Sequence, residues 1–102
     1  MINSAKTIQI FLPDGNARSV RIAEITSRTV QAIQIPRTKI SEAGKREEVK
    51  NVGVYFLFGE DEETGLPLVY IGEAEECHIR IAQHNRTKGF WESAVAITSK
   101  TN

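Results

Sequence analysis

Two short tyrosine–glycine triplets carry the side chains of this sequence that are best suited to chemistry. Gly53-Val54-Tyr55 and Tyr70-Ile71-Gly72 each join a phenol to a glycine, and Arg80 and His84 follow soon after. An Arg guanidinium makes paired, charge-assisted hydrogen bonds to phosphate oxygens, and a His can move a proton near neutral pH. Brought together, these groups would suit cleavage of a phosphodiester, which needs a base for water and positive charge on the developing phosphate.

A hairpin and a following helix must position these residues. Val52 to Phe58 and Leu68 to Ile71 are predicted to be antiparallel strands joined by an acidic, glycine-bounded loop. Glu73 to Asn85 is predicted to be a helix whose acidic first turn complements the helix dipole. The alternation from Phe90 to Thr98 predicts a third strand of the same sheet.

On a helix, positions three and four apart share one face. That spacing predicts a single stripe of four side chains: Glu73, Cys77, Arg80 and His84. Simpler roles stay open, because Arg80 could pair with Glu76 four residues earlier and His84 could only complement the helix dipole. The two tyrosines could likewise be ordinary strand aromatics with solvated hydroxyls.

The rest of the chain divides into two stretches. Residues 1–36 are predicted to be a β-rich N-terminal extension, with an alternating run from Thr7 to Phe11 and a Pro-Asp-Gly turn after it. Residues 37–51 form a charged connector with a short helix that is interrupted or ends near Gly44. Its basic residues could touch a phosphate backbone, although a solvated helix face is the more ordinary interpretation.

Composition bounds the class of protein. The 102 residues fit one small domain or one domain plus part of a neighbour, and 13 basic residues balance 13 acidic ones. The zero net charge counts mildly against a stand-alone, tight DNA binder. Cys77 is the single cysteine, which excludes an internal disulfide and suits a reducing cytosol. We therefore expect a cytoplasmic protein without a membrane span or a signal peptide.

The order of these motifs resembles the GIY-YIG nuclease superfamily. The resemblance covers Val52 to about Thr98 and rests on two triplets on paired strands, with Arg80 and His84 on the next helix. It implies an α+β fold in which a small three-stranded antiparallel sheet is flanked by helices, with residues 52–102 as a nuclease core. It also implies a DNA endonuclease that depends on Mg²⁺ or Mn²⁺, with DNA as the partner.

The resemblance assigns roles to individual side chains. Tyr55 would be the general base or the phenol that positions water, and Tyr70 would contact the scissile phosphate. Arg80 would stabilise the phosphate or leaving group, and His84 would transfer a proton or contact substrate. A phenol of ordinary pKa is a poor base, and Arg80 or a metal could lower that pKa. The remaining motif positions, which would permit close backbone packing at the strand ends, are Gly53 and Gly72.

Two positions depart from the family pattern. Glu73 stands where the family often has a small, polar or basic residue, and its carboxylate would repel DNA unless a cation neutralised it. The metal-binding Glu of the family lies on a helix after the third strand, so we expect it beyond Asn102, and Glu92 does not match it.

We therefore expect this chain to be the N-terminal portion of a longer endonuclease, truncated at its C-terminus and inactive by itself. The alternative is a non-catalytic domain of the same fold that binds nucleic acid or a protein. A third reading is a mixed α/β domain whose triplets are coincidental.

Overall fold

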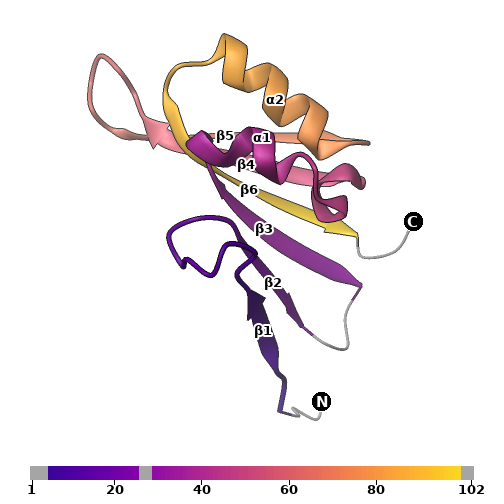
Figure 1. Cartoon of the computed structure of the whole chain (residues 1–102). Helices are drawn as coiled ribbons and strands as arrows, with labels where there is room; N and C mark the ends of the chain where they lie inside the picture. The colour runs from indigo at the N-terminus through magenta and orange to yellow at the C-terminus, as the bar shows by residue number, and fades with distance from the viewer. Residues whose placement is uncertain (1–4, 26–28, 100–102) are drawn as a thin grey trace, which may run out of the picture.

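A six-stranded antiparallel sheet organises the chain (Figure 1). The structure is a computed structural model that describes residues 5–25 and 29–99. The strands follow the order β1-β2-β3-β6-β4-β5 across the sheet. Their bounds are β1 (Ile8–Phe11), β2 (Arg21–Ile25), β3 (Val30–Pro36), β4 (Gly53–Glu60), β5 (Pro67–Ala74) and β6 (Trp91–Ser99). The α+β class expected from the sequence is confirmed.

The prediction of a three-stranded sheet is corrected to six strands. The expected three are present as β4, β5 and β6, but β6 pairs with β4 on one side and with β3 on the other. The cause is a shared buried surface, because Ile33 lies opposite Ala96 and Ile35 opposite Ala94. β2 and β1 then continue the sheet beyond β3, so the strands of the N-terminal stretch pair directly with the strands that carry the motifs.

The helical segments lie together on one face of the sheet (Figure 1). They are the short turns η1 (Arg37–Lys39), α1 (Ile40–Ala43) and η2 (Glu47–Lys50), and the longer helix α2 (Cys77–Thr87). The interruption expected near Gly44 is confirmed, because α1 ends at Ala43. None of the helices in the described ranges is long and apolar enough to cross a bilayer.

The predicted start of the long helix at Glu73 is wrong. Glu73 and Ala74 complete β5, where they pair with Val54 and Gly53, so α2 begins only at Cys77. Its first turn therefore carries no acidic residue. Ladder hydrogen bonds to β4 take precedence over the dipole pattern that suggested an earlier helix start.

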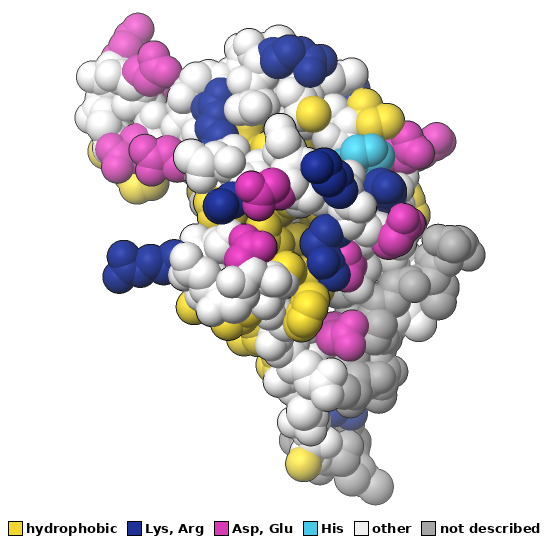
Figure 2. Space-filling view, in the orientation of Figure 1, with side chains coloured by type: hydrophobic (Ala, Val, Ile, Leu, Met, Phe, Trp, Pro, Cys, Tyr) yellow, Lys and Arg dark blue, Asp and Glu magenta, His cyan; other side chains and the backbone are white. Residues whose placement is uncertain are grey.

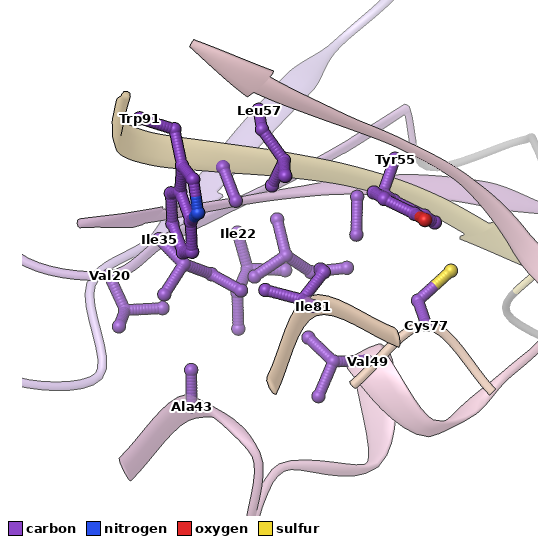
Figure 3. Packing of buried hydrophobic residues seen from close by; sticks show 13 residues of the cluster. Val20, Ile22, Ile35, Ala43, Val49, Tyr55, Leu57, Cys77, Ile81 and Trp91 are labelled. Carbon is purple, nitrogen blue, oxygen red and sulfur yellow. The ribbon is translucent and has the colours of Figure 1, made fainter. Parts of the chain in front are cut away.

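The hydrophobic core lies between the sheet and the helical segments (Figure 3). Ile81 enters it from α2 and Val49 from η2, and both are buried. The sheet contributes its largest fully buried side chains from the three strands β3, β4 and β6: Trp91, Tyr55, Ile33, Ile35 and Leu57. The residues of the motifs therefore belong to the same core as the residues of the N-terminal strands.

The opposite face of the sheet is not covered by any described helix (Figure 1). Alternation along the strands directs a row of large apolar side chains to this face, which we call the open face. Ile8, Ile10 and Ile71 are each more than three-fifths exposed, at 65%, 62% and 62%. The other large apolar residues exposed there are Val30, Val54, Phe58 and Val69.

Arg37 anchors the C-terminal end of α2. Its Nε donates a hydrogen bond to Asn85 Oδ1 at 2.8 Å, and its terminal nitrogens donate to the carbonyls of Asn85 and Trp91 at 2.8 and 2.9 Å. Its guanidinium carbon lies 4.6 Å from the centroid of the Trp91 ring. The last carbonyls of a helix lack hydrogen-bond partners within the helix. Arg37, from the charged connector, therefore caps the C-terminal end of α2.

Replacing Arg37 with Lys keeps the charge but removes the planar set of donors. We expect Arg37→Lys to lower the free energy of unfolding by about 1–3 kcal/mol, because several hydrogen bonds from a charged donor to Asn85 and Trp91 are lost. Urea denaturation measures this change. Lys39→Ala is the control, since an exposed ion pair of this kind contributes less than about 1 kcal/mol. Equal stability of Arg37→Lys and wild type would contradict the anchoring role.

Candidate functional site

Tyr55, Tyr70 and His84 meet between the sheet and α2, and we call them the phenol–imidazole cluster. The Tyr55 hydroxyl lies 2.8 Å from His84 Nε2, within a hydrogen bond. The Tyr70 ring centroid lies 4.8 Å from that of His84 and 6.2 Å from that of Tyr55. The structure thus brings together three of the four side chains that the resemblance marks as catalytic.

Strand register places both tyrosines on the helix-covered face. Tyr55 lies opposite Gly72 and Tyr70 lies opposite Leu57, so the two phenols are diagonal neighbours on adjacent strands. Gly72 leaves the space that the Tyr55 ring fills, because a Cβ there would come within 2.5 Å of Tyr55 Cζ and of its hydroxyl oxygen. The two triplets are therefore complementary in shape.

The other motif glycine permits a close contact between strands. A Cβ at Gly53 would come within 2.1 Å of the carbonyl oxygen of Ile97 on β6. Gly53 therefore lets β4 and β6 approach each other closely at one end of the sheet. This contact helps to hold β4 in the register that positions Tyr55.

The hydrogen-bonded pair is nearly enclosed. Tyr55 is 1% exposed and His84 is 7% exposed, whereas Tyr70 is half-buried. Buried polar groups need partners, and here the phenol and the imidazole satisfy one another. The backbone of His84 is held as well, because the Trp91 indole Nε1 donates to its carbonyl oxygen at 3.3 Å.

Burial sets the protonation states of this pair. It raises the pKa of Tyr55, and the hydrogen bond and charge of Arg80 only partly oppose that rise. Burial also lowers the pKa of His84, with the nearby charges of Lys88 and Arg80 adding to the effect. Near neutral pH the phenol is therefore protonated and the imidazole neutral. In the tautomer with its proton on Nδ1, the imidazole accepts the Tyr55 hydroxyl proton at Nε2.

Two cations flank the cluster. The exposed Arg80 side chain interacts with the Tyr55 hydroxyl, and Lys88 Nζ lies 4.7 Å from the centroid of the Tyr70 ring. Arg80, His84 and Lys88 follow one another at intervals of four, the first two on one face of α2 and Lys88 directly after its last residue. Sequence reasoning missed Lys88, although the spacing that linked Arg80 to His84 reaches it in one further step.

Positive charge at the cluster is local. Figure 2 shows Lys and Arg side chains interspersed with Asp and Glu around α1 and α2, with acidic side chains gathered on the β4–β5 hairpin. Within the described residues, the three ion pairs involve Lys39, Arg46 and Lys50. The alternative pairing of Arg80 with Glu76 is therefore not formed.

Two members of the predicted stripe lie elsewhere. Glu73 is on β5, exposed beside the open face, because its side chain alternates with Gly72. Cys77 is buried in the core at the start of α2, and burial raises the pKa of its thiol. Neither belongs to the cluster, so the predicted stripe of four reduces to Arg80 and His84.

The donor set does not fit a metal ion. Across residues 5–25 and 29–99, no three or more His, Cys, Asp or Glu side chains gather where they could hold one. The Mg²⁺ or Mn²⁺ implied by the resemblance would need ligands from outside these residues.

The chemistry of the site follows from its geometry. A protonated phenol bonded to a neutral imidazole can pass a proton along that bond, and two cations beside it can receive an anion. No protein-family model, curated protein or solved structure matches this chain. The class of site rests on its geometry alone: a hydrogen-bonded phenol–imidazole pair beside two cations.

The fit between Gly72 and Tyr55 can be tested by a double-mutant cycle. We expect Gly72→Ala to lower the free energy of unfolding by about 1–3 kcal/mol, because the new methyl group displaces the Tyr55 ring. Chemical denaturation measures the loss. In a Tyr55→Ala background the same substitution should cost little, since the ring is gone. A similar cost in both backgrounds would contradict this fit.

The protonation state of His84 predicts how stability depends on pH. Its pKa is lower in the folded chain than the value of about 6.5 expected after unfolding, so below that pH the unfolded chain binds more protons. The free energy of unfolding should therefore fall as pH drops through about 6.5. Urea midpoints between acidic and neutral pH measure the slope. The His84→Gln variant should show a shallower slope, and an unchanged slope would rule out this contribution.

Proposed function

We propose that this chain carries the phosphodiester-cleaving core of a GIY-YIG-type DNA endonuclease. The observation that supports this most is the hydrogen bond between Tyr55 and His84, which unites a motif strand with the following helix. The second motif strand, β5, lies beside β4 and adds Tyr70 to the same cluster. We place the protein in the cytoplasm, where a free thiol such as Cys77 persists.

In this proposal the Tyr55–His84 pair works as a proton relay. A water oxygen forms a bond to phosphorus while the bond from phosphorus to the leaving oxygen breaks. The Tyr55 oxygen takes a proton from that water as its own proton passes to His84 Nε2. The leaving oxygen is protonated from solvent, and His84 later returns its proton to solvent. Because the phenol has a raised pKa, transfer to a neutral imidazole avoids the need for a free phenolate.

Arg80 and Tyr70 would bind the phosphate in this mechanism. Arg80 is exposed and takes part in no ion pair within the described residues, so its guanidinium is available for two phosphate oxygens. Because it also interacts with the Tyr55 hydroxyl, a phosphate bound by Arg80 would lie beside the relay. The half-buried Tyr70 would orient the same phosphate through its hydroxyl. These steps use only side chains of this chain, and no step passes through a metal ion.

A second proposal is a non-catalytic domain of the same fold that binds nucleic acid or a protein. It is favoured by the enclosure of Tyr55, which is 1% exposed and must be reached by water during catalysis. The zero net charge of the chain, which gives no general attraction to DNA, also favours it. Binding without cleavage separates this proposal from the first.

The protein at its natural full length is expected to nick supercoiled plasmid DNA with Mg²⁺ or Mn²⁺. Tyr55→Phe removes the relay and Arg80→Ala removes charge stabilisation, and each should lower the rate by about 100-fold or more. Gel assays of plasmid conversion measure the rates. Lys50→Ala is the control, because Lys50 lies in an ion pair away from the cluster.

Each outcome of this assay is informative. Nicking at the wild-type rate by both Tyr55→Phe and Arg80→Ala would overturn their assigned roles. DNA binding with no nicking in either metal would favour the non-catalytic domain over the endonuclease.

A further inference from the structure

The end of α2 carries a cation that the relay does not use. Lys88 is the residue that caps the helix, and its backbone N–H donates to the carbonyl of His84 at 2.9 Å. Its side chain is half-buried and its Nζ lies over the Tyr70 ring, 4.7 Å from the centroid. The first contact fixes the backbone of Lys88, and the second places its ammonium group at the edge of the phenol–imidazole cluster.

The charge of Lys88 is available to a ligand. Among the lysines of the helical segments, Lys39 and Lys50 are each paired with a glutamate, at 3.7 and 3.6 Å, whereas Lys45 is exposed between α1 and η2, away from the cluster. Lys88 is in none of the ion pairs among the described residues. Its charge, like that of Arg80, lowers the pKa of His84, so both cations lie near the phenol–imidazole cluster.

The spacing of the two cations separates their roles. Arg80 and Lys88 are eight residues apart, which places their backbones about 12 Å apart at a rise of about 1.5 Å per residue. That separation suits two phosphates of one strand better than two contacts to the same phosphate. Arg80 lies beside Tyr55 and its relay, whereas Lys88 lies beside Tyr70.

We propose that Lys88 binds a second backbone phosphate of the same DNA strand, next to the phosphate that Arg80 binds. This inference rests on the proposed function and adds to it a second anchoring point for the substrate. A lysine contacts phosphate as a point charge, and such a contact holds the strand in register without taking part in bond breaking. Loss of Lys88 should therefore weaken binding while leaving the chemical step intact.

A salt titration distinguishes this role from a structural one. The full-length protein is titrated against a short fluorescent DNA duplex in EDTA at several salt concentrations. Lys88→Met keeps an unbranched side chain against Tyr70 but removes the charge. We expect it to weaken binding several-fold at low salt and to reduce the slope of log K against log salt by about 0.9, the value for one phosphate contact.

Matched variants complete the experiment. Lys88→Arg should restore the slope, because it restores the charge, and Lys50→Met should leave it unchanged. In nicking assays Lys88→Met should raise KM and leave kcat within about twofold of the wild-type value. This pattern is expected for a contact that is equally strong in the bound ground state and in the transition state. If thermal denaturation shows that Lys88→Met is not folded, Lys88→Gln provides a second neutral variant.

Failure of this inference can be told apart from failure of the proposed function. An unchanged salt slope in Lys88→Met, with normal DNA binding by the wild type, would overturn the role of Lys88 alone. A fall in kcat as large as that of Arg80→Ala would overturn the assignment to a flanking phosphate. Absence of both binding and nicking in the wild type would overturn both proposals.

Discussion

The contact between Tyr55 and Gly72 is the constraint on which the site depends. The Tyr55 ring occupies the space that any side chain at position 72 would take, and only there does its hydroxyl reach His84. The strand register of the hairpin and the position of α2 are thereby linked through one side chain. Trp91 binds the carbonyl of His84 and Arg37 caps the same end of the helix, so the imidazole is held through its ring and through its backbone.

The residues that support the cluster come from the whole described chain. β3 lies beside β6 and contributes Ile33 and Ile35 to the core under α2. Without that strand, one edge of β6 would be unpaired and the small side chains of Ala94 and Ala96 would lack large neighbours. Residues outside the resemblance therefore stabilise the platform on which the motif side chains lie, although they contribute no group to the cluster itself.

Local patterns predicted the hairpin and the strand β6 well, because alternation and turn residues act over a few positions. They failed at Glu73, where pairing with Val54 extends β5 past the expected helix start. They could not give the burial of Tyr55 or the raised pKa that follows from it, since both depend on packing by α2. The role of Arg37 was also hidden, because its partner Asn85 lies far along the chain.

The open face has a consequence for how copies of this chain interact in water. A contiguous apolar surface favours association, and proteins commonly offset such a tendency with repulsion between like net charges. Here the formal net charge is zero at pH 7 and the isoelectric point is about 6.7. Colloidal repulsion is therefore weakest near neutrality, the pH range in which the exposed side chains of Ile8, Ile71 and their neighbours can most readily bring two copies together.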